Sequence, residues 1–117
     1  MYFGESTPYD PRHEAIDIAV DTGTPIRAMR AGTVAVAGWA FPGEPQRSYG
    51  LMVLLQHDRG YSTLYGHLSA LKVAPGEAVA AGQVIGLSGA TGLVTGPHLH
   101  LELRRGSQRL DPLKYAR

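Results

Sequence analysis

The sequence contains no cysteine, which excludes disulfides, thiolate zinc sites and cysteine nucleophiles. It also has little net charge, because 11 Lys and Arg residues are balanced by 10 Asp and Glu residues, for a formal charge of +1. This balance argues against a nucleic acid or an anionic membrane as a partner bound through bulk electrostatics. No apolar run approaches the roughly 20 residues of a membrane span. The N-terminal segment has no basic stretch followed by an apolar one, so no signal peptide is predicted.

Helical periodicity is absent too, whereas Gly (15) and Pro (8) are abundant for 117 residues. This composition predicts short elements joined by tight turns, and the length predicts one domain over residues 1–117. Strand-like segments recur between turn signals at residues 15–20, 33–37, 51–56, 61–65, 78–80, 83–88 and 98–104. We therefore predict a mainly β fold: a compact, antiparallel, sandwich-like sheet with short hairpins and an active-site groove.

Two hairpins are predicted from the turn residues, one over 51–65 and one around Ala81-Gly82 between 78–80 and 83–88. The stretch 39–49 holds two prolines and is expected to be a loop, which either borders a binding site or simply connects two strands. Residues 111–115 are expected to form one helical turn.

His98 and His100 are two residues apart in the most regular alternation of the chain, HLHLELR. Residues at this spacing point to the same face of a strand, so both imidazoles line one cleft or one solvated face, while the leucines pack on the other side. Glu102 lies on the imidazole face and either orients a ring or meets solvent. With no cysteine available, histidines and carboxylates are the strong transition-metal ligands of this chain.

His13 and Asp17 form a second group with a spacing of four residues. Both reach one ion only if a turn separates them, because four residues of strand span about 13 Å. Together with one histidine of the 98/100 pair they make two imidazoles and a carboxylate, a catalytic zinc pattern with an open fourth position. His67 follows the end of the strand predicted over 61–65 and is either a surface residue or a hydrogen-bond donor or proton carrier in the same cleft. His57 is interpreted as a structural turn histidine.

The order of these motifs resembles that of zinc metallopeptidase domains of the lysostaphin/LytM type, peptidase family M23. The matching segments are HEAID at 13–17, GTP at 23–25, YGHL at 65–68, GQVIG at 82–86 and GPHLHLE at 96–102. The resemblance implies zinc bound by His13, Asp17 and His100, with His67 and His98 as catalytic histidines. It also implies that zinc activates a water molecule and that one of the two catalytic histidines accepts its proton. Ala15 departs from the glycine usual in the family.

The resemblance further implies a zinc endopeptidase that hydrolyses stem or cross-bridge peptides of bacterial peptidoglycan. It implies an exported chain that acts in the periplasm or at the cell wall and is the catalytic part of a longer precursor. The alternative is a non-catalytic module of the same fold that binds the wall or activates a partner hydrolase. A phosphohistidine carrier, which needs no metal, is a further alternative. No nucleic-acid partner is expected.

Overall fold

The computed structural model describes residues 15–44, 48–92, 96–106 and 108–110. These residues form nine strands and one short 3-10 turn, η1 (Asp58–Gly60). The strands are β1 (Ala15–Ala19), β2 (Pro25–Arg27), β3 (Gly32–Trp39), β4 (Leu51–Gln56), β5 (Tyr61–Leu71), β6 (Ala78–Val79), β7 (Val84–Ser88), β8 (His98–Arg105) and β9 (Gln108–Leu110). Every strand pairing is antiparallel, which confirms the predicted mainly β fold. Among the described residues, no helix is long and apolar enough to cross a membrane.

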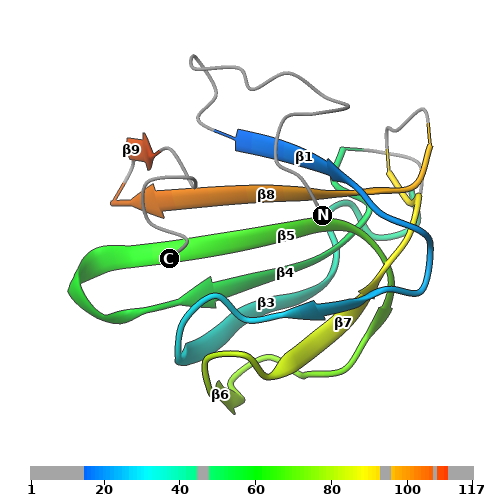
Figure 1. Cartoon of the computed structure of the whole chain (residues 1–117). Coiled ribbons are helices and arrows are strands. Elements are labelled where there is room, and N and C mark those ends of the chain that lie inside the picture. The colour runs from blue at the N-terminus through cyan, green and yellow to red at the C-terminus, as the bar shows by residue number, and fades with distance from the viewer. Residues whose placement is uncertain (1–14, 45–47, 93–95, 107, 111–117) are drawn as a thin grey trace.

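The strands follow the order β1-β8-β5-β4-β3-β6, with β7 joined to both β5 and β2, and β9 joined to β8 (Figure 1). The central strand is β5, which pairs with β4 on one side and changes partners along the other. Its first part, up to Gly66, pairs with β8, and its last part, from Leu68, pairs with β7. His67 lies between these two parts, at the point where β5 changes its partner from β8 to β7.

The hydrophobic core takes side chains from strands at both ends of the sheet. On β8 the leucines 99, 101 and 103 are buried, as the alternation of that segment predicts. The apolar run of β4 is buried along nearly its whole length, as predicted for a strand covered on both faces. Ile18 of β1, Val34 of β3 and Ile85 of β7 join the same cluster. Fully burying such a side chain stabilises the fold by about 1.5–3 kcal/mol, so this core fixes which face of these strands turns inward.

The predicted hairpin over 51–65 is confirmed by the pairing of β4 with β5. The hairpin predicted around Ala81-Gly82 is wrong, because β6 pairs with β3 while β7 pairs with β2 and β5. A tight turn does occur there, since the Gln83 amide donates to the Ala80 carbonyl. However, Ala28 bonds the backbone of both Gly82 and Gln83, so the chain leaving the turn joins β2 instead of returning along β6.

Two strands were not predicted. β2 begins at Pro25, inside a cluster of turn residues, and β9 has only three residues. The helical turn predicted at 111–115 lies outside the described residues. The loop predicted at 39–49 does separate β3 from β4, although Trp39 still belongs to β3. Its last residues, Ser48 and Tyr49, line a cleft that is described below. The extent of the single domain, 1–117, stays a prediction.

Candidate metal centre

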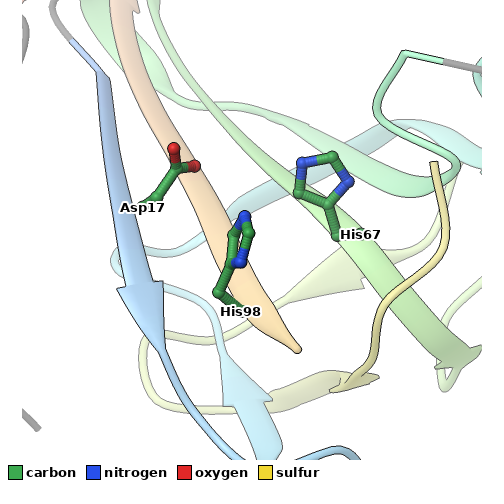
Figure 2. A group of neighbouring side chains, drawn as sticks. All are labelled: Asp17, His67 and His98. Atoms are coloured by element: carbon green, nitrogen blue, oxygen red, sulfur yellow. The ribbon is translucent and has the colours of Figure 1, made fainter. Parts of the chain in front are cut away.

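Three adjacent strands bring the candidate residues into one row. Asp17 of β1 lies opposite His100 of β8, and His100 lies opposite Gly66 of β5. His98 lies two residues before His100 on β8, so its side chain is on the same face of the strand. Figure 2 shows Asp17, His67 and His98 on three neighbouring strands, and ligand atoms of these three residues all lie within 4.8 Å of one another. The strand alternation thus places Asp17, His98 and His100 on one face of the sheet.

Asp17 and His100 form the tightest pair of this row. The Oδ1 atom of Asp17 and the Nδ1 atom of His100 are 2.8 Å apart. Two donors at about 2.0–2.2 Å from one tetrahedral zinc ion are separated by roughly 3.3 Å, so these atoms fit a shared ion with little movement. Burial opposes ionisation of Asp17, but the imidazole of His100 outweighs it and lowers the pKa of the carboxyl. An anionic oxygen and a ring nitrogen are the donor types that zinc prefers when thiolates are lacking.

His67 reaches this face through an irregularity of the backbone. Between Tyr65 and Leu68, β5 holds one residue more than β4 does between Val53 and Leu51, which is a β-bulge. His67 itself has a φ of 62°, in the left-handed region that non-glycine residues rarely adopt. A regular strand would turn His67 to the face opposite Gly66, toward the core. The bulge turns it toward the cleft instead, and such backbone strain is concentrated at functional sites.

The ring of His67 is held in one orientation. Its Nδ1 lies 2.7 Å from the carbonyl oxygen of Thr91. A carbonyl only accepts, so Nδ1 carries the proton and the neutral ring has its lone pair on Nε2. Burial lowers the pKa of His67, although the Thr91 carbonyl works in the opposite direction. The neutral ring is therefore favoured, and its Nε2 is a base. The ring lies edge-on to that of His98, with centroids 5.3 Å apart.

Behind His100 lies a buried carboxylate. Glu102 is 1% exposed and accepts hydrogen bonds from His100 Nε2 at 2.8 Å and from the Tyr49 hydroxyl at 2.6 Å, both on Oε2. Its Oε1 accepts two further bonds from Arg104. Burial alone would raise the pKa of Glu102, but these hydrogen bonds outweigh it and lower that pKa to about 2. Burial would likewise lower the pKa of His100, yet its two carboxylate partners raise it to about 9.

A cleft of about 300 Å³ opens over these residues, lined by Asp17, Ser48, Tyr49, His67, His98 and His100. Four of the five residues predicted for the site thus meet in one cleft. The fifth, His13, lies outside the described residues, and β1 begins two positions after it, at Ala15. His57 is away from the cleft and bonds the Ala31 carbonyl and the Thr63 hydroxyl, which confirms its structural interpretation.

Sequence reasoning missed Tyr49 and Thr91. The Thr91 hydroxyl donates to the carbonyl of Leu68 and accepts from the amide of Leu51, so it connects β5 to the start of β4. Tyr49 lies at the end of the loop that was expected either to border a site or simply to connect strands. Neither residue belongs to a metal-ligand pattern, and their contacts are made across 23 to 53 positions of sequence.

The antiparallel sheet, together with a cleft of two imidazole bases beside an aspartate–histidine donor pair, defines a β-sheet protein with a candidate divalent-metal centre. Comparison with known proteins gives its family. Residues 11–112 match the model of Peptidase family M23, so the chain belongs to this family, as its motifs indicated.

Individual relatives agree with this assignment. The DD-carboxypeptidase/endopeptidase Mpg of Neisseria meningitidis is 42% identical over 104 residues, which are 89% of this chain and 23% of that protein. The catalytic domain of lysostaphin from Staphylococcus simulans superposes with a TM-score of 0.78 at 35% identity, over 89% of this chain and 78% of that one. A zinc-containing peptidase from Vibrio cholerae superposes with a TM-score of 0.75 at 35% identity, over 84% of this chain and 28% of that one. The chain therefore spans about a quarter of the length of the curated relative.

Proposed function

We propose that this chain is a zinc-dependent endopeptidase that hydrolyses peptide bonds in the stem or cross-bridge peptides of bacterial peptidoglycan. The observation that carries the proposal is the 2.8 Å approach of Asp17 Oδ1 and His100 Nδ1, with His67 and His98 beside them in one cleft. Membership of Peptidase family M23 supports the reaction class. The site of action that follows is the periplasm or the cell wall.

Asp17 and His100 would hold the metal together with His13. A zinc ion bound by two histidines and one aspartate keeps an open position, where it lowers the pKa of a water molecule and polarises a scissile carbonyl. Asp17 has a second arrangement available, because its carboxylate also lies near the ring nitrogens of His67 and His98. We favour His100 as the ligand because its Nδ1 lies 2.8 Å from Asp17, while Glu102 occupies its other nitrogen, as in many carboxylate–histidine–metal arrangements.

His67 and His98 would then move protons. Thr91 keeps the proton of neutral His67 on Nδ1, so Nε2 is able to take a proton from the attacking water. His98 faces the same cleft from β8 and is placed to donate a hydrogen bond to the developing oxyanion or a proton to the leaving amine. Both rings lie in the same cleft with their centroids 5.3 Å apart, so the two roles could also be assigned the other way round.

The test is the release of new amino groups from purified peptidoglycan, measured before and after metal removal. We expect the release to stop with a chelator, to return with added zinc, and to be lost in His98→Ala while the fold is kept. Release that continues after complete metal removal would refute the proposal. A His98→Ala protein that still lyses cells with a partner hydrolase would favour the non-catalytic module.

A further inference from the structure

Glu102 lies behind His100 and is not among the residues that line the cleft. Its side chain is 1% exposed, and its two oxygens together accept four hydrogen bonds, from His100, Tyr49 and, twice, Arg104. Four hydrogen bonds from described residues match the roughly four lone-pair directions of a carboxylate, so the protein itself engages this group. A buried charge that is hydrogen-bonded in this way acts by orienting the groups that bind to it.

The group at the metal centre that Glu102 orients is His100. Both ring nitrogens face a carboxylate, Glu102 at Nε2 and Asp17 at Nδ1. Because Glu102 is buried behind the ring and Asp17 lines the cleft, Nδ1 is the nitrogen that a metal beside Asp17 would take, and Glu102 would then accept the proton that remains on Nε2. We propose that Glu102 is a positioning residue that presents His100 to the metal through Nδ1, and that Tyr49 and Arg104 hold Glu102 in place for this task. This inference rests on the proposed function, in which His100 is a zinc ligand.

Tyr49 gives this arrangement a connection to the cleft. Its ring lines the cleft and lies tilted against the ring of His100, with centroids 5.1 Å apart, while its hydroxyl reaches the buried Glu102. The ring has space for this because position 66 is glycine: a Cβ there would lie 3.2 Å from the Cβ of Tyr49. Through Tyr49, the loop between β3 and β4 thereby helps to retain the metal as well as to line the cleft.

The first experiment measures zinc affinity by competition with a chromogenic chelator. Glu102→Gln places amide hydrogens where Glu102 now accepts bonds, and we expect a loss of about 10- to 100-fold in zinc affinity, as for other residues that orient metal-bound histidines. Tyr49→Phe removes one of the four bonds, and we expect a loss of roughly 3- to 10-fold. The matched controls are Glu77→Gln, at an exposed glutamate, and Tyr65→Phe, at a buried tyrosine that bonds Thr63 and Met29; both should keep wild-type affinity.

The double variant tests whether Tyr49 acts through Glu102. In the Glu102→Gln background, Tyr49→Phe should lower zinc affinity no further. An undiminished effect there would overturn the role of Tyr49 in holding Glu102. Wild-type zinc affinity in a folded Glu102→Gln protein would overturn the proposal as a whole, and if that variant does not fold, wild-type affinity in Tyr49→Phe would overturn its Tyr49 part.

The second readout is the nitrogen NMR spectrum of the histidine rings in the zinc-loaded protein. Wild type should show His100 protonated at Nε2 and metal-bound at Nδ1, and Glu102→Gln should show a mixture of ring states. An unchanged His100 signal in Glu102→Gln would contradict the proposal. A wild-type protein that binds no zinc would instead refute the proposed function, so the two failures are distinguishable.

Discussion

Replacing Thr91 by Val should destabilise the protein by about 2–4 kcal/mol although the side chain keeps its shape. The Thr91 hydroxyl donates to the Leu68 carbonyl at 2.6 Å and accepts from the Leu51 amide at 3.1 Å. Valine makes neither bond, and each backbone group left without a partner in a buried site costs about 1–3 kcal/mol. We take the lower half of the summed range because Thr91 is only half-buried.

The assay is urea denaturation of the metal-free protein, with Thr91→Ser as the matched control, since serine keeps the hydroxyl and loses only a methyl group. Thr91→Ser should lose about 1 kcal/mol or less. The Thr91 carbonyl also accepts from His67, so Thr91→Val should broaden the His67 ring signals, whereas Thr91→Ser should not. Equal free energies of unfolding for the two variants would refute the reasoning.

Two further predictions concern the core and the loop that carries Tyr49. Burial raises the pKa of the Tyr65 hydroxyl above 10.0, so the stability that this shift contributes is present below pH 10 and is lost as the pH rises further. Tyr65→Phe should therefore lose less stability than wild type between pH 10 and 11. A parallel loss of stability in both proteins would contradict this prediction. A Cβ on Gly92 would lie 2.4 Å from the Ser48 carbonyl oxygen, whereas one on Gly76 would meet nothing within 4 Å, and both glycines have positive φ. Gly92→Ala should therefore destabilise by more than the roughly 1–2 kcal/mol that positive φ alone costs, and more than Gly76→Ala in the same urea assay; equal losses would show that the close approach is unimportant.

The strands around the site were predictable because their patterns are local. The alternation of 98–104 predicts which face of β8 carries the histidines, and the apolar run at 51–56 predicts β4 with the same bounds. The site residues were predicted from motif order, and the structure brings Asp17, His67, His98 and His100 into one cleft. Their individual roles stay predictions, as does that of His13.

Other features depend on contacts that no local pattern contains. The turn predicted within 78–88 is present, but the hairpin is not, because Gly82 and Gln83 form backbone hydrogen bonds with Ala28 instead. The left-handed backbone conformation of His67 is stabilised by two hydrogen bonds, from its backbone amide to the Tyr49 carbonyl and from its ring to the Thr91 carbonyl. These partners are 18 and 24 positions away in the sequence. Glu102 was recognised as lying on the right face, but its four hydrogen bonds include one from the Tyr49 loop, which sequence reasoning does not place.

The central claim is that Asp17 and His100 bind one zinc ion while His67 and His98 act on the substrate. The most direct test is zinc stoichiometry and affinity in four single variants: Asp17→Ala, His100→Ala, His67→Ala and His98→Ala. We predict that the first two lose the site and that the last two keep it while losing turnover. Retained zinc in His100→Ala, with loss in both His67→Ala and His98→Ala, would contradict the account and assign the metal to Asp17, His67 and His98.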